Sequence, residues 1–369
     1  MAALRSFADL VHNRDFCSPV LPCSSLITVT AIFPLHNVLP LDSAGESQRW
    51  TDSSVSADAD GTSDTDLSSI QGGVITIGNF DGVHRGHAEL LGHVKRLADQ
   101  MGGPAIAIVL DPHPATVLRP ELAPERLTRI ETRAELMDRM GIDALVVCAT
   151  SRRFLSMSTD QFFDSLVKDR LQAKAIVEGP NFFFGRDRGG DVRVLAELCD
   201  AANIKLQIVK SMQVGRQMIS STRIRRLLIE GAVAEAAGLL GYPHRICGTV
   251  ESGAKRGRQI GFPTANLSEI DVVVPGPGVY AGHVRIADQK HPAAIHIGPN
   301  PTFEPDGDSK VEVHVLDYDG DLYDQNVQVE FLHRVRDVAK FDSPDALVTQ
   351  LQQDIADIRS ALSQPFGES

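Results

Sequence analysis

Residues 74–101 read VITIGNFDGVHRGHAELLGHVKRLADQM, and this stretch decides the fold of the first half of the chain. The apolar, β-branched run that ends at Gly78 predicts a buried strand. The later part carries Leu91, Val94 and Leu97 at helical spacing and predicts an amphipathic helix. A glycine-rich turn joins the two elements, at the place where open α/β sheets bind their ligands.

Four further apolar runs follow between helical segments, at residues 105–110, 144–150, 173–179 and 205–211. Each run has the length of a buried strand. Strands that alternate with helices predict a parallel sheet with helices on both faces. We therefore expect a Rossmann-like α/β domain over residues 70–243.

The chain changes character after residue 243. Short strand candidates, separated by Gly, Pro and Asp turns, occur at residues 246–252, 278–287, 291–298, 311–319 and 326–332. This pattern predicts an antiparallel β-barrel, because no long helix interrupts it. A final helix is expected after Ser343, a suitable N-cap that is followed by Pro344. We assign residues 244–365 to this second domain.

Residues 1–69 differ from the rest. They hold three basic residues against nine acidic ones, and residues 51–69 are an acidic, low-complexity run with almost no large apolar side chain. Such a run cannot offset its ordering entropy by burial, so we expect a disordered or variable extension. The earlier run at residues 26–39 fits either one strand or a docking segment.

Composition excludes several classes of protein. The net charge of −12 argues against a nucleic-acid-binding protein, which usually carries a basic surface. The five cysteines form no C-x-x-C pair, so we expect no disulfide framework and a cytoplasmic location. No apolar run reaches the roughly 18 residues of a membrane span. We expect a monomer or a weak homo-oligomer with no membrane partner.

The turn after the first strand is suited to phosphate. Its glycines let the backbone approach a ligand closely, and the following helix presents free N–H groups to an anion. His84 and His87 could hydrogen-bond phosphate oxygens, although a glycine-rich turn with two surface histidines remains the plain alternative. A zinc site fits less well, because no cysteine lies near. The candidate binding residues are Gly78, Asn79, Phe80, Asp81, Gly82, His84 and His87.

A second phosphate-binding candidate is ISSTRIR, residues 219–225. Hydroxyl side chains and arginines at the start of a helix can clamp a polyphosphate. An ordinary capped basic helix is the alternative. The candidate residues are Ser220, Ser221, Thr222, Arg223 and Arg225.

A third candidate lies in the second domain, in the glycine-rich and basic residues 253–267. Thr264 and Asn266 are two apart, so an extended backbone points both to one side, where their oxygens suit Mg²⁺. Glu312, on a predicted strand, could accept a proton from an attacking alcohol. A turn-rich loop and a solvent-facing glutamate are the alternatives. The candidate residues of the loop are Gly253, Lys255, Gly257, Arg258, Gly261, Pro263, Thr264 and Asn266.

The pair NFDGVHRGH and ISSTRIR resembles the FMN adenylyltransferase module of bacterial bifunctional riboflavin kinase/FAD synthetases. The resemblance implies a nucleotidyltransferase domain in which the first two candidate sets bind ATP, with His84 and His87 catalytic. The DPHP and NFFFGR segments, residues 111–114 and 181–186, resemble the flavin side of that module. They imply FMN contacts from His113, Asn181, Phe182 and Phe184. Asn181 stands where the family has an acidic residue, and core packing is the alternative for both phenylalanines.

The second half resembles the riboflavin kinase domain of the same family. Four segments occur in the family's order: GFPTAN, PGVYA, IGPNPTF and VEVH. Asp324 stands where the family usually has glycine. The resemblance implies Thr264 and Asn266 at Mg-ATP and Glu312 as the general base. It also implies flavin-side positions at Asn300, Thr302, Arg336 and Phe341.

Over residues 70–365 the resemblance implies two reactions that use ATP and Mg²⁺. Riboflavin would be phosphorylated to FMN, and FMN would be adenylylated to FAD. Two alternatives stay open. One is an enzyme that retains only one of the two activities, and the other is a non-catalytic flavin-binding regulator, since fold does not determine function.

Overall fold

The computed structural model describes residues 31–35, 67–214, 217–251, 260–287, 289–299 and 310–363. These residues form two compact units. The sheet unit comprises Thr28–Pro124 and Ile130–Met212, and the barrel unit comprises Glu125–Arg129 and Gln213–Ser369. The expected disorder of residues 1–69 lies largely outside the described residues. Each unit is described by itself below.

The sheet unit contains a six-stranded sheet whose strands all run parallel. The strand order is β1-β4-β3-β2-β5-β6. The strands are β1 (Ala31–Leu35), β2 (Val74–Gly78), β3 (Ala105–Asp111), β4 (Ala144–Ala149), β5 (Ala175–Glu178) and β6 (Lys205–Ile208). The predicted α/β class is therefore confirmed. Strand β1 lies within the expected extension and pairs with β4 at the edge of the sheet, a position that tolerates its Pro34.

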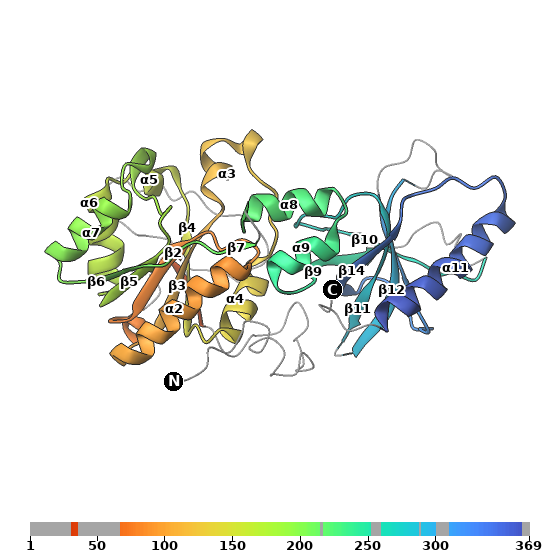
Figure 1. The fold of residues 1–369 in the computed structure, drawn as a ribbon, viewed down its shortest axis with the longest axis horizontal. Helices are drawn as coiled ribbons and strands as arrows, with labels where there is room; N and C mark the ends of the chain where they lie inside the picture. Colours follow the sequence, from red (N-terminus) through yellow and green to blue (C-terminus); the bar gives the residue numbers. More distant parts are fainter. Residues whose placement is uncertain are drawn as a thin grey trace. The chain divides into compact units, whose positions relative to one another are not determined.

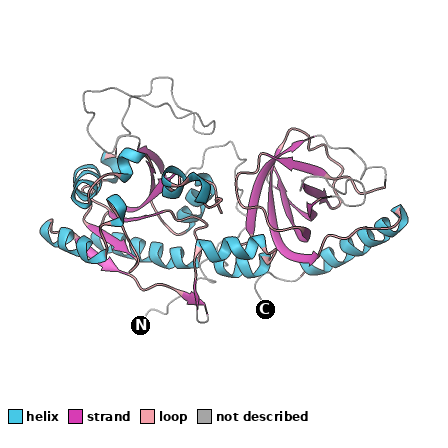
Figure 2. Cartoon of the chain, turned by 90° about the horizontal axis from the view of Figure 1, so that it is seen from above, coloured by secondary structure: helices cyan, strands magenta, loops and turns pink. Residues whose placement is uncertain are grey.

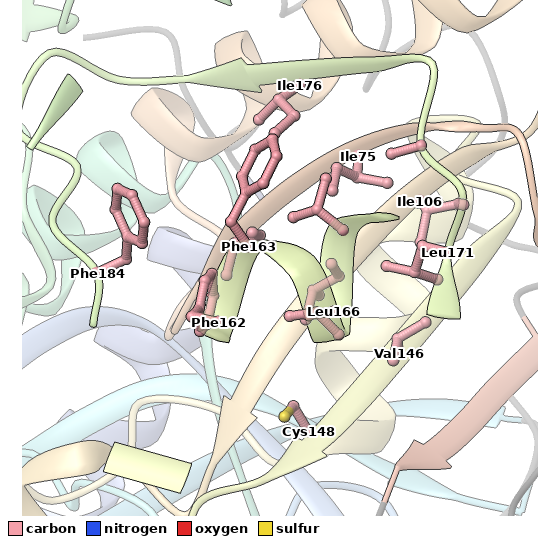
Figure 3. Close-up of a cluster of buried hydrophobic side chains, with 14 of the residues drawn as sticks. Ile75, Ile106, Val146, Cys148, Phe162, Phe163, Leu166, Leu171, Ile176 and Phe184 are labelled. Carbon is pink, nitrogen blue, oxygen red and sulfur yellow. The ribbon is translucent and has the colours of Figure 1, made fainter. Parts of the chain in front are cut away.

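Helices cover both faces of this sheet (Figure 1). Helix α2 (Arg85–Met101) packs on β2, β3 and β5. A separate core cluster joins these strands to a π-helix (Phe163–Arg170) and to α7 (Val192–Ala201), and it contains no residue of α2. Figure 3 shows the aromatic and leucine side chains of the π-helix region facing the isoleucines of the sheet. These side chains form the core on this face of the sheet.

Two shorter helical segments flank the same sheet. Helix α4 (Ile130–Arg139) precedes β4, and α3 (Pro114–Leu118) follows β3. Helix α6 (Thr159–Phe162) begins with a capping box at Ser158 and runs into the π-helix. The remaining short helical turns are α5 (Arg152–Leu155), η1 (Ser68–Ile70), η2 (Pro120–Leu122) and η4 (Arg186–Arg188).

The barrel unit is built on a closed antiparallel barrel, as predicted, with strand order β10-β13-β12-β11-β14-β9. Its strands are β9 (His244–Glu251), β10 (Ala265–Ser268), β11 (Gly278–Ile286), β12 (Gln289–Gly298), β13 (Lys310–Val315) and β14 (Asn326–Arg336). Side chains alternate along each strand, so that Val311 and Val313 are buried while Glu312 and His314 lie on the other face. Figure 2 colours these strands magenta and the helices cyan.

Helix α11 (Pro344–Leu362) covers β11, β12 and β14. Ser343 caps it by accepting a hydrogen bond from the N–H of Ala346, and Pro344 occupies the first turn, which confirms the predicted helix start. A two-stranded ribbon, β7 (Gln213–Val214) and β8 (Gln217–Met218), also belongs to this unit.

The packing divides the chain near residue 212, before helices α8 (Ser221–Ile229) and α9 (Val233–Leu240). Helix α9 contacts β9 and β14, so it packs as part of the barrel unit. The boundary at residue 243, expected between functional domains, stays a prediction. No helix in the described part of the chain is both long and apolar enough to cross a membrane.

Candidate active sites

A tight loop connects β2 to α2 in the sheet unit. Phe80, Gly82 and Val83 all have positive φ, at 47°, 82° and 32°. Only glycine adopts this region without strain, so the surrounding structure must hold the two larger residues in place. Phe80 and Val83 are both buried, which supplies that constraint. The loop turns the chain directly from the end of the strand into the helix.

His84 and His87 lie side by side where α2 begins. His84 is the N-cap, and its Nδ1 accepts a hydrogen bond from the N–H of His87 at 3.2 Å. The two imidazole rings stack with their centroids 3.6 Å apart, and the Phe80 ring meets His87 edge-on at 5.2 Å. The structure therefore brings these two predicted catalytic residues together at a helix N-terminus, where anions are stabilised.

Both imidazoles are neutral at pH 7. Burial lowers the pKa of His84 to about 4, although a hydrogen bond with its own main chain and the Asp81 carboxylate act in the opposite direction. Burial, then His84, then Arg133 hold the pKa of His87 well below its usual value. The Nδ1 atom of His87 is buried without a hydrogen-bond partner among the described residues. A neutral imidazole can donate one N–H to a phosphate oxygen.

Arg133, on α4, was not predicted from the sequence. It is 3% exposed and donates to the main-chain oxygen of Asn79 and to the Oδ1 atom of Asp81, each at 3.1 Å. These bonds hold the loop from the side of α4, and they engage the carboxylate of the predicted binding residue Asp81. The available sequence signal was an arginine on the apolar side of α4, beside the buried Ala134 and Met137.

Glu178 was also missed. It ends β5 and is 2% exposed, and its Oε1 accepts hydrogen bonds from Ile77 N at 2.6 Å and Thr76 Oγ1 at 3.3 Å. The only sign of this role in the sequence was its position, as an acidic residue at the end of an otherwise apolar strand.

The predicted FMN contacts lie in different environments. His113 caps α3, where its Nδ1 accepts from the N–H of Ala115 at 3.1 Å. Phe182 stacks on Phe184 with centroids 5.5 Å apart, and Phe184 is 6% exposed and belongs to the core cluster. Asn181 is exposed. The FMN roles of these residues stay predictions.

The aromatic ring that faces solvent in this segment is that of Phe183, which is 45% exposed. The guanidinium carbon of Arg188 lies 4.5 Å from the centre of its ring. The turn that separates Phe183 from the core continues through Gly185, whose φ is 72°.

The predicted polyphosphate-binding residues, 220–225, lie at the N-terminus of α8. Ser220 is the N-cap, and its Oγ accepts from the N–H of Arg223 at 3.3 Å, while Ser221 and Thr222 form the first turn. Arg225 donates through Nε to the main-chain oxygen of Glu125 at 2.6 Å. These residues belong to the barrel unit, whereas His84 and His87 belong to the sheet unit. Their joint action on one nucleotide stays a prediction.

In the barrel, the register places Asn266 of β10 directly opposite Glu312 of β13. Glu312 lies in turn opposite His296 of β12. Directly opposite residues of antiparallel strands point to the same face. The neighbouring Val311, Val313 and Leu267 are buried, so the polar row lies on the outer face of the barrel. His296 was not predicted from the sequence.

The loop before β10 is partly described. Thr264 is exposed, and the main-chain oxygen of Pro263 accepts a hydrogen bond from His314 Nδ1 at 2.7 Å. Gly261 has a φ of 87°, as a tight turn requires. The predicted residues Gly253, Lys255, Gly257, Arg258, Asn300 and Thr302 lie outside the described residues.

Arg336 links the barrel to its C-terminal helix. Its Nε and Nη2 atoms donate to the two carboxylate oxygens of Asp354 on α11, at 2.8 and 2.7 Å. Its guanidinium carbon lies 5.7 Å from the centre of the Phe341 ring. The contact that the structure gives Arg336 is therefore the ion pair with Asp354, which ties β14 to α11. The flavin contacts of Arg336 and Phe341 stay predictions.

Comparison with known proteins identifies the family of each half of the chain. The FAD synthetase family matches residues 67–223, and the riboflavin kinase family matches residues 240–362. A bifunctional riboflavin kinase/FMN adenylyltransferase from Pseudomonas fluorescens is 37% identical, over 80% of this chain and 94% of its own length. The Escherichia coli K12 protein of that description is 34% identical, over 77% of this chain and 91% of its own.

A solved structure, described as a macrolide-efflux protein from Streptococcus pneumoniae, superposes with a TM-score of 0.72. It is 35% identical and covers 78% of this chain and 94% of its own. The two domain matches and the identity over nearly the whole length of the curated relatives lead to one conclusion. The chain belongs to the family of bifunctional riboflavin kinases/FMN adenylyltransferases.

Proposed function

We propose that this chain makes FAD from riboflavin in two ATP-dependent steps, at two separate active sites. The observation that carries the proposal is that each unit holds its own set of polar side chains suited to phosphate chemistry. The sheet unit has two neutral, stacked histidines at a helix N-terminus. The barrel unit has an amide and a carboxylate directly opposite each other. These sets suit different phosphate chemistries.

The barrel would phosphorylate riboflavin. The ribityl 5′-hydroxyl attacks the γ-phosphorus of ATP, its proton passes to the Glu312 carboxylate, and the bond from the γ-phosphorus to the bridging oxygen breaks to release ADP. A positioned carboxylate contributes to such a step by taking the proton in the transition state. Glu312 is half-buried on the outer face of the barrel, beside Asn266. Asn266 is placed to bind and orient the phosphates.

The sheet unit would transfer the adenylyl group. A phosphate oxygen of FMN attacks the α-phosphorus of a second ATP, and the bond to the β-phosphate breaks to release pyrophosphate. No side-chain base is needed, because the FMN phosphate is already an anion. The neutral His84 and His87 donate hydrogen bonds as negative charge builds on the leaving pyrophosphate. The N-terminus of α2 stabilises the same charge.

Magnesium fits the kinase loop. Thr264 and Asn266 offer hard oxygen atoms on adjacent parts of one extended segment, and Mg²⁺ is commonly held by one or two such groups together with substrate phosphates. When bound, Mg²⁺ would neutralise phosphate charge. We further propose a cytoplasmic location, a monomer or weak homo-oligomer, and no nucleic-acid or membrane partner, which the net charge of −12 supports for nucleic acid.

A product time course tests the assignment. Purified protein is incubated with riboflavin, ATP and Mg²⁺, and flavins are separated by chromatography. We expect FMN to appear first and FAD to follow. FMN that accumulates without FAD would refute the dual assignment in favour of a kinase alone. Tight flavin binding without turnover of ATP would instead favour the alternative of a non-catalytic flavin-binding regulator.

A further inference from the structure

The sheet opens at the carboxyl ends of β2 and β5. These two strands pair only at Val74 and Ile75 of β2. Strand β2 continues to pair with β3 as far as Gly78, and β5 continues to pair with β6 as far as Glu178. The strand order of the sheet reverses at this point, since β3 and β4 lie on one side of β2 and β5 and β6 on the other. Open α/β sheets bind ligands in the crevice at such a switch point.

The side chain of Glu178 spans this opening. Continued pairing would place Ile77 opposite Glu178, because Ile75 pairs with Ile176. The strands have separated there, and the Ile77 N–H instead donates to Glu178 Oε1 at 2.6 Å. A buried N–H without an acceptor is costly, because its bond to water is lost and not replaced. The carboxyl group therefore takes the place of the missing ladder bond.

The residue that Glu178 holds leads directly into the loop between β2 and α2, the proposed nucleotide loop. Ile77 is followed by Gly78 and Asn79, and the main-chain oxygen of Asn79 is held by Arg133. The loop is thus held at the strand end by Glu178 and farther along by α4. The backbone of Glu178 stays in the ladder with β6, because its carbonyl accepts from Val209 N at 2.8 Å.

We propose that Glu178 is a positioning residue for adenylyl transfer. Its side chain fixes the carboxyl end of β2, and with it the turn of His84 and His87, relative to the segment that follows β5. This inference rests on the proposed function of the sheet unit. Glu178 acts through the main chain of β2 and is not a catalytic residue.

The protonation of Glu178 suits this position. Burial raises its pKa to about 8, against the hydrogen bonds from Ile77, Thr76 and Gly179, and no charged side chain is among the causes of the shift. The group is therefore mostly a neutral acid at pH 7. A buried carboxylate would repel two substrates that each carry phosphate, whereas the neutral acid holds the strand without that repulsion.

Three variants of the full-length protein test the role. E178L removes the acceptor, and we expect kcat/KM for FAD formation from supplied FMN to fall by about tenfold or more, since small displacements of reacting groups are costly. E178Q keeps an acceptor for Ile77 N and is neutral, so it should stay within about threefold of wild type. T76V is the matched control, because it removes only the 3.3 Å contact and leaves the 2.6 Å bond. Riboflavin phosphorylation by the same preparations should be unchanged.

The pH profile gives a readout that a purely structural role would not produce. Wild-type FAD formation should decline above about pH 8, as Glu178 ionises, while E178Q should show no such decline. If E178L does not fold, the rate of E178Q keeps the positioning role testable, because that variant retains the acceptor for Ile77 N.

Two results would overturn the positioning role alone: E178L with wild-type kcat/KM, or E178Q, which keeps an acceptor for Ile77 N, with a loss as large as that of E178L. A T76V defect as large as that of E178L would also contradict it, because the bond to Ile77 N would not be the one that matters. A wild-type protein that forms FMN but no FAD would refute the proposed function, and this inference with it.

Discussion

The rings of His84 and His87 can stack 3.6 Å apart because both side chains are neutral. Two imidazolium ions at that distance would repel each other in a site that burial has already removed from water. The two rings can therefore act on a phosphate as N–H donors rather than as cations, and the N-terminus of α2 adds its dipole. Such groups are oriented before the substrate binds, so little reorganisation accompanies the reaction.

At His87, removal of the imidazole should impair one reaction only. We expect H87A to lower kcat for FAD formation from supplied FMN by about 100-fold, the usual loss when one donor to a developing charge is removed. Riboflavin phosphorylation should not change. H93A is a matched control on the same helix, where His93 contacts Gln207 and Glu89, and it should keep both rates. Equal loss of both activities in folded H87A would contradict separate sites.

Glu312 gives the reciprocal prediction. E312A should slow FMN formation by about 100-fold or more, because the attacking hydroxyl loses its proton acceptor. FMN supplied to the same protein should still be converted to FAD. E235Q changes an exposed glutamate on α9 and serves as the control. Retention of FMN formation by E312A, measured at saturating ATP and riboflavin, would exclude Glu312 as the base.

At the level of elements, local sequence pattern was sufficient for β2, α2 and five of the six barrel strands, whereas β10 lies in the stretch that was interpreted as a glycine-rich loop. Period-two alternation around Glu312 and helical spacing after His87 are local signals, and each element forms where they occur. Strand β1 could only be left open, because a five-residue strand depends on its pairing with β4, which is distant in sequence. Its stability is a property of the sheet.

Contacts between residues distant in sequence also limit what could be predicted of the candidate site in the sheet unit. Arg133 contacts the loop after β2 from 54 positions away in the sequence, and Glu178 contacts the end of β2 from 101 positions away, and no spacing rule reaches that far. Which of the neighbouring aromatic residues is exposed could not be predicted either. Phe184 forms an antiparallel bridge with Gly190 and lies in the core, whereas the adjacent Phe183 is exposed.

The buried ion pair between Arg133 of α4 and Asp81 of the loop after β2 should contribute strongly to stability. Arg133 and Asp81 are both buried, so removal of the cation leaves a buried carboxylate without its guanidinium. We expect R133M to lower the free energy of unfolding of the sheet unit by about 3–5 kcal/mol. The double variant R133M/D81N should recover part of the loss. Urea denaturation measures both, and an R133M protein as stable as wild type would contradict the prediction.

The hydrogen bond from the Ile77 N–H to the Glu178 side chain links β2 to β5. Because Glu178 can ionise, the free energy of unfolding should depend on pH. In the folded protein Glu178 holds its proton up to about pH 8, whereas an unfolded glutamate releases it near pH 4.5. Between these values the folded state binds more protons, so rising pH destabilises wild type through this group. E178Q has no such group. Its free energy of unfolding, relative to wild type, should therefore increase steadily from pH 4.5 to 8, and a constant difference would show that the folded pKa is not raised.

Across the whole molecule, the two reactions are consecutive, and the product of one is the substrate of the other. The groups proposed to react in each step lie in different units, with Glu312 in the barrel unit and His84 and His87 in the sheet unit. Neither proposed step requires a reacting side chain of the other centre. Damage to one centre should therefore leave an enzyme that completes the other half of the route.

Complementation in solution tests this independence. On the time scale of the wild-type reaction, H87A alone should stop at FMN and E312A alone should leave riboflavin almost unchanged, so neither forms appreciable FAD from riboflavin. An equimolar mixture should form FAD after a lag, because FMN released by H87A diffuses to E312A. The lag should shorten as more E312A is added, since capture of free FMN is bimolecular. If FMN accumulated in the mixture and no FAD followed, the second centre would accept FMN only from the barrel of its own chain, and the two centres would not be independent.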